Sequence, residues 1–285
     1  MSPDNGIEAP KTTSWQYGDD YQRRQAGTFR QRHSNQWKPR MALVHELIDT
    51  HVLPRFGVRA PRSIVTLDVG CSIGTIAIEM ALRGFTAHGV DFDASALAIA
   101  RELAAEEGVQ VEWHLGDVAQ WQPAAGGVDI ALCFDIFEHL HDDELGALLQ
   151  GIRRHLSEQG ALVFHTFPLQ YDYLFFSHAL ANWPLRPFTW LPAAAFERLA
   201  RAYAALLDAG LLLGTGRSYK ERIRKAAHCN TTTRSRLLEV LEQPGYAVSV
   251  IETANLYRDK PHVARWFGHQ PVAHRNLYGV AVPRR

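Results

Sequence analysis

This sequence of 285 residues has few cysteines, no net charge and no long apolar run. Its three cysteines, Cys71, Cys133 and Cys229, are far apart and lack metal-ligand spacing, so we expect reduced thiols and no disulfide framework. Lys+Arg and Asp+Glu each number 30, so the basic excess of a typical nucleic-acid binder is missing. No stretch approaches the roughly 20 apolar residues of a membrane span, and the polar N-terminus lacks the apolar core of a signal peptide. The composition therefore predicts a cytoplasmic protein with neither a nucleic-acid nor a membrane partner.

The sequence does contain strand-like and helix-like segments in alternation. Strands are predicted at 63–69, 86–91, 110–115, 128–134, 161–166, 247–252 and 276–282, and helices at 73–82, 94–107, 142–156 and 233–242. Strands that alternate with helices over such short spacings are typical of βαβ units in a parallel sheet. We therefore predict an α/β protein with a doubly wound, mostly parallel, seven-stranded Rossmann-like sheet.

The remaining segments divide the chain into five parts. Residues 1–16, rich in Pro, Ser, Thr and Asp, are predicted to be a disordered tail. Residues 17–60 carry a helical pattern and form an N-terminal extension. The α/β core is expected at 61–169 and resumes at 228–285. Between its two parts, 170–227 is aromatic-rich and then helical without strand candidates, which indicates a helical insertion after the fifth strand.

Four motifs follow the predicted strands in order, where ligands of such sheets bind. The first, DVGCSIG at 68–74, opens a helix, and its glycines let a ligand approach backbone N–H groups. Its G-x-x-x-G spacing differs from the G-x-G-x-x-G of a dinucleotide site. GVD at 89–91, GDV at 116–118 and FDIFEHL at 134–140 follow. The acidic residue of the second motif can accept from ribose hydroxyls, and that of the third from an adenine amino group. A lone Asp at a strand end is more often a turn or helix cap, but four motifs in order predict a cofactor site.

This order of motifs resembles the class I S-adenosylmethionine-dependent methyltransferases, in particular the small-molecule branch with an EH pair after the fourth strand. The resemblance covers about 61–168 and resumes more weakly over 228–285. It implies an enzyme with S-adenosyl-L-methionine as cofactor and 61–169 as the cofactor-binding core. The residues that it places at the cofactor are Asp68, Gly70, Cys71, Ser72, Gly74, Asp91, Phe92, Asp117, Val118 and Phe134.

Within this set, the resemblance assigns separate parts of the cofactor to separate residues. The first motif lines the methionine and sugar, Asp91 takes the ribose hydroxyls, Phe92 packs on the adenine, and Asp117 with Val118 reads the adenine edge. Ser72 departs from the glycine usual in the family, which puts direct backbone approach at that position in doubt.

The N-terminal extension, 17–60, resembles a lid that folds over the cofactor in similar enzymes. Tyr21, Trp37 and Arg40 are then candidate contacts of the methionine end. The alternative is that this segment is a helical packing unit or a dimer contact, and we expect a monomer or a homodimer.

A hydroxyl acceptor needs a base with a pKa near neutrality, for which histidine is the default. His139 follows the fourth strand and His165 ends the fifth, so both are candidate general bases, with Glu138 as runner-up. The alternative for each histidine is a structural role or a cofactor contact. The histidines are scattered and the acidic residues are accounted for as ligand acceptors, so no catalytic metal is expected.

The insertion is predicted to cover the substrate, with Tyr171, Tyr173, Phe176 and Trp183 as walls of a partly apolar acceptor pocket and His228 at the return from the insertion. Packing of the insertion onto the sheet is the alternative for these aromatic side chains. The predicted function is methyl transfer to a small-molecule acceptor, most simply O-methylation in natural-product or sugar tailoring. The alternatives are an N-methyltransferase acting mainly by proximity, an NAD-dependent oxidoreductase, and a non-catalytic binding module.

Overall fold

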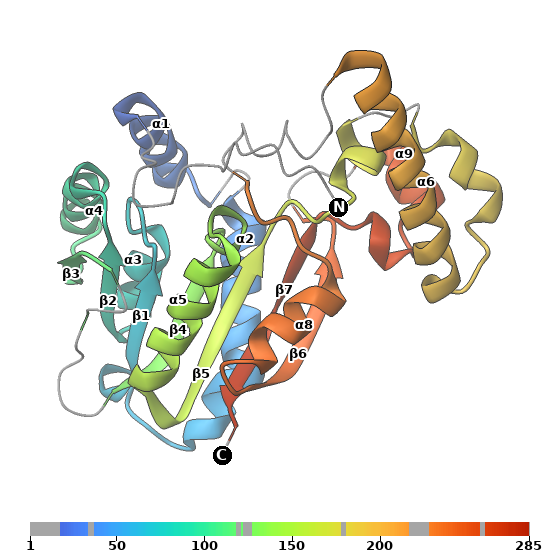
Figure 1. Cartoon of the computed structure of the whole chain (residues 1–285). Coiled ribbons are helices and arrows are strands. Elements are labelled where there is room, and N and C mark those ends of the chain that lie inside the picture. The colour runs from blue at the N-terminus through green and yellow to red at the C-terminus, as the bar shows by residue number, and fades with distance from the viewer. Residues whose placement is uncertain are drawn as a thin grey trace.

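The computed structural model describes residues 18–33, 37–117, 121, 127–177, 181–216, 228–256 and 260–284. Seven strands form one sheet in the order β3-β2-β1-β4-β5-β7-β6 (Figure 1). They are β1 (Val65–Val69), β2 (Thr86–Asp91), β3 (Glu112–Leu115), β4 (Val128–Phe134), β5 (Leu156–Thr166), β6 (Tyr246–Ala254) and β7 (Asn276–Pro283). Strands β1 to β5 pair in parallel, and β7 runs antiparallel to β5 and β6. The predicted doubly wound, mostly parallel sheet is confirmed.

Some helices connect these strands, and the others lie outside the strand–helix alternation. They are α1 (Asp19–Arg30), α2 (Trp37–Leu47), α3 (Thr75–Leu82), α4 (Ala94–Glu106), α5 (Asp142–His155), α6 (Ala193–Thr215), α8 (Arg234–Glu242) and α9 (Pro261–Phe267). Among the helices built from the described residues, none is long and apolar enough to cross a membrane. The predicted tail at 1–16 and Val118 lie outside the described residues.

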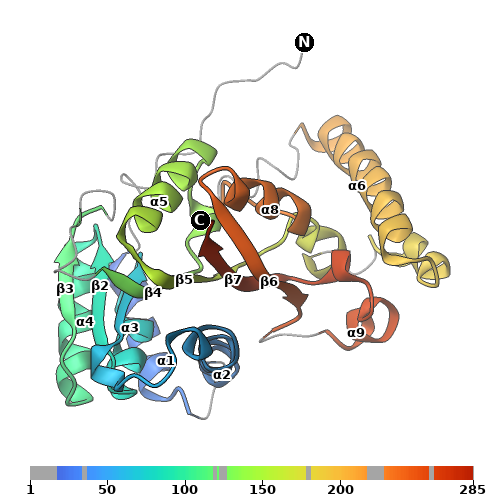
Figure 2. The same cartoon turned by 90° about the horizontal axis from the view of Figure 1, so that it is seen from below.

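Helices bury both faces of the sheet (Figure 2). Along the central strand β4, Ala131 and Cys133 join a core cluster with residues of α5 and α8. Ile130 and Leu132 alternate with them and join a second cluster with residues of α2 and α3. A parallel strand covered on both faces reads as a continuous apolar run, which is why β4 shows no alternation of apolar and polar residues.

Two further helical units lie beside the carboxyl-terminal edge of the sheet. Helix α1 packs on α3 and α4 through a cluster that includes Phe29 and Leu103. The insertion forms its own cluster, in which Phe196 of α6 contacts Phe267 of α9. In Figure 1, α1 lies at the upper left, above α3 and α4, and α6 lies at the right, beyond the sheet. The strands therefore end between two helical units that come from distant parts of the sequence.

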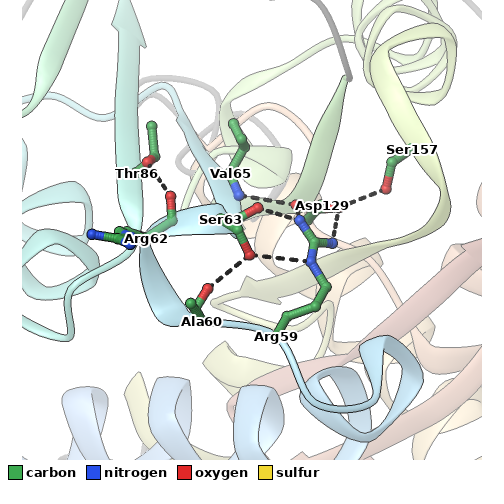
Figure 3. A network of polar contacts seen from close by, with 8 residues as sticks. All are labelled: Arg59, Ala60, Arg62, Ser63, Val65, Thr86, Asp129 and Ser157. Atoms are coloured by element: carbon green, nitrogen blue, oxygen red, sulfur yellow. Dashed lines mark hydrogen bonds and ion pairs between the residues drawn. The ribbon is translucent and has the colours of Figure 1, made fainter.

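A polar network joins the strands at the opposite, amino-terminal edge of the sheet (Figure 3). Asp129 of β4 is buried, and its two carboxylate oxygens accept from the two Nη atoms of Arg59, each at 3.0 Å. They also accept from the Val65 N–H at 3.0 Å and from the Ser157 hydroxyl at 2.8 Å. Because Val65 begins β1 and Ser157 lies in β5, one carboxylate holds three neighbouring strands in register.

Several elements differ by one or more residues from the sequence-based boundaries, and two of these differences have a clear structural cause. Strand β5 begins at Leu156 and not at residue 161, because Leu156 pairs with Val128 ahead of an irregularity in register, after which Ala161 pairs with Ile130. Helix α3 begins at Thr75, two residues later than predicted, because the glycine loop turns through a left-handed Gly74 before the helix starts.

Candidate active site

A cavity of about 620 Å³ opens at the carboxyl ends of β1, β2 and β4. The chain order reverses between β1 and β4, and ligands of open α/β sheets bind at such a reversal. Asp68 and Gly70 line the cavity from β1, Asp91 from β2, and Phe134 from β4. Three of the four predicted motifs therefore meet in one place.

The glycine loop after β1 is shaped by its backbone. The N–H groups of Gly70 and Cys71 donate to the carbonyl of Val90 at 2.9 and 3.1 Å, which holds the loop against β2. Gly70 has φ +65°, and a Cβ there would lie 2.4 Å from the Ile136 side chain. Ser72 also has a positive φ, 49°, in the region that favours glycine. The departure from glycine that the sequence shows at Ser72 therefore falls on a strained backbone position.

Two buried carboxyl groups face this loop. Asp91 accepts from the N–H of Ser72 at 2.7 Å and from that of Asp93 at 2.9 Å. Burial raises the pKa of Asp91, and these hydrogen bonds offset part of the rise. Asp68 accepts from the N–H of Ala77 in the first turn of α3, and burial raises its pKa to about 7.

A chain of polar contacts crosses the far side of the cavity. Asp135, directly after β4, pairs with Arg40 through Oδ2 and with His165 through Oδ1. The other ring nitrogen of His165, Nε2, lies 3.1 Å from the Asn276 amide. Burial alone would raise the pKa of Asp135, but Arg40 and His165 hold it well below its usual range.

The direction of these hydrogen bonds follows from Asn276. Its Oδ1 accepts from the Leu256 N–H at 2.9 Å, so its Nδ2 faces His165 and donates. His165 Nε2 is then the acceptor, and Nδ1–H donates to Asp135. His165 is fully buried and is not among the residues lining the cavity. Both of its nitrogens are engaged, so the structure corrects the expectation that His165 contacts the acceptor.

Glu138, His139 and His228 form a second polar group on the cavity wall. The rings of His139 and His228 have centroids 5.0 Å apart. Burial and the neighbouring His139 lower the pKa of His228 to about 4. Glu138 accepts from the Thr166 hydroxyl at 2.7 Å through Oε2, while its buried Oε1 has no hydrogen-bond partner in the described part of the chain. Burial and Asp135 raise the pKa of Glu138 well above its usual value.

The N-terminal extension reaches the cavity. Tyr21, Trp37 and Arg40 line it, and Gln22 adds a contact that the sequence did not indicate, while the role of this segment as a lid stays a prediction. Gln22 is buried and donates to Asp93 at 2.6 Å.

Among the other residues predicted at the cofactor, Gly74 and Asp117 do not line the cavity. Gly74 leaves room for Trp113, which a Cβ would meet at 2.2 Å, so this glycine serves helix–strand packing. Asp117 follows β3 and is exposed without lining the cavity, and its role at the adenine stays a prediction. Cys71, Ser72 and Phe92 do line it.

The aromatic residues predicted for the acceptor pocket lie elsewhere. Tyr171, Tyr173 and Phe176 are buried in the core of the insertion, where the Tyr173 hydroxyl donates to the Ala204 carbonyl. Trp183 is 67% exposed. None of the residues at 168–227 that the structure describes lines the cavity. This placement corrects the expected pocket walls, because Tyr171, Tyr173 and Phe176 bury apolar area against α6 and α9 and Trp183 is mostly exposed.

Sequence reasoning assigned no role to Asp135, Asn276 or Gln22. Asp135 stood inside the fourth motif, directly after Phe134, so its place at a strand end was the available signal. Asn276 had none, because only the antiparallel pairing of β7 with β5 brings it beside His165.

The donor set of the cavity fits S-adenosylmethionine. Asp91 offers carboxylate oxygens suited to ribose hydroxyls, and Phe92 offers a ring suited to an adenine. The positive φ and missing side chain of Gly70 open the loop backbone on the same wall.

Comparisons with known proteins agree with this fit. A family described as "Methyltransferase domain" matches residues 66–160. Ubiquinone biosynthesis O-methyltransferase from Sodalis glossinidius is 32% identical over 117 residues, which are 41% of this chain and 45% of that protein. The enzyme of the same name from Pseudomonas syringae pv. tomato is 33% identical over 103 residues, 35% of this chain and 43% of that protein. The chain thus matches less than half the length of these curated relatives.

The fold is shared more widely than the sequence. An S-adenosylmethionine-dependent methyltransferase from Clostridium acetobutylicum superposes with a TM-score of 0.55 at 12% identity, covering 94% of this chain and all of that one. The order of the motifs, the position of the cavity and the match to the methyltransferase domain all favour S-adenosylmethionine as the cofactor. None of them supports the alternative of an NAD-dependent oxidoreductase. Over residues 66–160 the α/β core of this chain is thus similar to the methyltransferase domain, and its fold is that of an S-adenosylmethionine-dependent methyltransferase.

Proposed function

We propose that this chain transfers the methyl group of S-adenosylmethionine to a hydroxyl oxygen of a small, partly apolar molecule. The observation that carries the proposal is the meeting of two groups of residues in one cavity. The motif residues Asp68, Gly70 and Asp91 come from β1 and β2, and Glu138, His139 and His228 come from the other side of the chain reversal. A cofactor and an acceptor can therefore be held side by side.

The cofactor supplies, when bound, an electrophilic methyl group on a sulfonium. In this proposal Asp91 binds the ribose, Phe92 packs on the adenine, and Asp68 with the glycine loop holds the methionine end. Arg40, fixed by Asp135, orients the same end, and α1 covers it with Tyr21. Such alignment is worth roughly 7–11 kcal/mol in favourable cases.

His139 is the proposed general base. His228 is a weak proton acceptor, because its pKa is lowered to about 4, and it stays neutral beside His139. Burial and Asp135 raise the pKa of Glu138, which favours its protonated form, and that form can donate from Oε1 to an acceptor oxygen. His165 is a positioning residue, which acts on the cavity through Asp135.

The acceptor is proposed to lie between the two ends of the insertion. Phe167, Leu256 and His228 line the cavity there, which gives it an apolar wall beside the His139 imidazole. The names of the relatives support oxygen as the methylated atom and do not extend to natural-product or sugar tailoring. The insertion is then a cover for this pocket and does not supply its walls.

The test measures binding and turnover separately. We expect calorimetric binding of S-adenosylmethionine by the wild type and its loss in Asp91→Ala. With 4-octylcatechol as acceptor, His139→Gln is expected to lower kcat by about 10²–10⁴-fold, the usual worth of a general base, with cofactor affinity within about threefold.

The matched amine 4-octylaniline distinguishes the nitrogen alternative. Turnover of the amine but not the catechol, unaffected by His139→Gln, would favour N-methylation by proximity. Failure of the folded wild type to bind S-adenosylmethionine would reject the proposal as a whole.

A further inference from the structure

Three metal-ligating side chains meet on the β2–β3 strand pair, on a face of the sheet outside the cavity. His88 of β2 pairs in register with Glu112 of β3, and His114 lies two residues further along β3. Because side chains two residues apart share one face of a strand, Glu112 and His114 both stand beside His88. One nitrogen or oxygen atom of each residue lies within 4.8 Å of the others.

Two contacts converge on one ring nitrogen in this group. His88 Nδ1 lies 3.2 Å from His114 Nε2 and also 3.2 Å from Glu112 Oε2. If Nδ1 carries a hydrogen, that single hydrogen has to be shared between Glu112 Oε2 and His114 Nε2 as acceptors. If Nδ1 accepts from His114 instead, its lone pair lies against the Glu112 carboxylate.

A cation bound by all three atoms removes the conflict. We propose that His88, Glu112 and His114 bind a divalent transition-metal ion of the zinc type. Two ligand atoms about 2.0–2.1 Å from a tetrahedral ion are about 3.3–3.4 Å apart, close to the two 3.2 Å separations at His88 Nδ1. Glu112 is 67% exposed and free to close the third side.

The surroundings place the ion between two strands, beside an aromatic side chain. The rings of His88 and His114 are stacked, and Trp121 packs edge-on against both, which gives the ligands an apolar flank. Strand β3 has four residues and lies at the edge of the sheet, paired with β2 alone (Figure 1). An ion shared by the two strands would fasten this short edge strand to the sheet.

The test uses the full-length chain without a histidine tag, freed of metal with a chelator and titrated with CoCl₂ and then ZnCl₂. We expect one Co²⁺ per chain with visible absorption of a four- or five-coordinate ion, displaced by Zn²⁺, and a rise in Tm. His114→Gln and Glu112→Gln, both on the edge strand, are expected to weaken binding by at least about tenfold, since losing a residue that merely orients a ligand already costs roughly 10–100-fold.

Two control variants locate the ion. His33→Gln removes an exposed histidine and should leave binding unchanged. His139→Gln alters the second group able to bind a metal, Glu138 with His139 and His228. If His139→Gln abolishes Co²⁺ binding while His114→Gln keeps it, or if the wild type binds no Co²⁺, the proposed site is wrong.

Discussion

Asp135 connects three distant segments at the level of a single side chain. Its carboxylate pairs with Arg40 of α2 and with His165 of β5, and His165 contacts Asn276 of β7. Its φ is +59°, a conformation that costs a residue other than glycine roughly 1–2 kcal/mol. The two charge-assisted contacts offset this strain, so the carboxylate is needed both for stability and for the shape of the cavity.

Asp135→Asn tests this coupling. The variant keeps the shape of the side chain but removes the charge, and we expect the free energy of unfolding to fall by about 2–4 kcal/mol in urea denaturation. Asp49→Asn is the matched control, because Asp49 pairs with Arg83 at an exposed position and should lose less than about 1 kcal/mol. Equal losses in free energy of unfolding in the two variants would show that the Asp135 contacts stabilise the fold no more than an exposed ion pair does.

The sequence indicated those site residues whose position follows from parallel strand ends. Asp68, Gly70, Asp91 and Phe134 were predicted to be together, and they line one cavity. The contact of His165 with Asn276 was out of reach, because it depends on the register of an antiparallel pair far apart in sequence. Its imidazole and its place at the end of the fifth strand made His165 a candidate base, but it is fully buried, with both ring nitrogens in contact with Asp135 and Asn276.

At the level of elements, α1 is held over the cavity by charged contacts with α4 and its connection. Arg30 makes two hydrogen bonds to Glu106 at 2.8 and 2.6 Å. Arg32 makes two to Glu107 at 2.9 and 2.8 Å, and its side chain is 5% exposed. Burial makes the Arg32 pair the stronger anchor, since the exposed pair is screened by water.

Arg32→Ala is expected to loosen α1 without unfolding the core. Faster amide hydrogen exchange should be confined to residues 19–33, and affinity for S-adenosylmethionine should fall several-fold because Tyr21 and Gln22 line the cavity. Arg201→Ala, which removes an exposed pair with Glu197 on α6, serves as the control. Unchanged exchange in α1 would mean that the Arg32 contacts do not hold this helix.

The insertion shows where element-level prediction fell short. Its helical character was predicted and observed, but its aromatic residues were assigned to the acceptor pocket. They are needed inside the insertion, because α6 and α9 lie beyond the edge of the sheet and must bury their apolar faces against each other. Aromatic content indicates buried area and does not say against which partner that area is buried.

At the level of the whole molecule, a buried carboxyl group in the cavity, Asp68, makes the free energy of unfolding depend on pH. In the folded state the pKa of Asp68 is about 7, above the usual value of 3.8. Between these two values the folded chain holds a proton that the unfolded chain releases, so the free energy of unfolding falls as pH rises from about 4 to 7 and levels off above. The same carboxylate is proposed to hold the cofactor. Its function therefore explains why the chain keeps a buried acid that lowers the free energy of unfolding.

Asp68→Asn removes this cost and should separate stability from function. The amide oxygen can still accept from the Ala77 N–H, but no charge forms in the buried site. We expect the variant to exceed the wild type in free energy of unfolding by about 1–3 kcal/mol at pH 8, with the difference shrinking toward pH 4, in urea denaturation at several pH values. Its affinity for S-adenosylmethionine should fall at the same time.

The control is Asp143→Asn, on the exposed first turn of α5, whose free energy of unfolding should run parallel to that of the wild type at every pH. A constant gap between Asp68→Asn and the wild type would show that Asp68 does not titrate in this range, because only a shifted pKa makes the difference depend on pH.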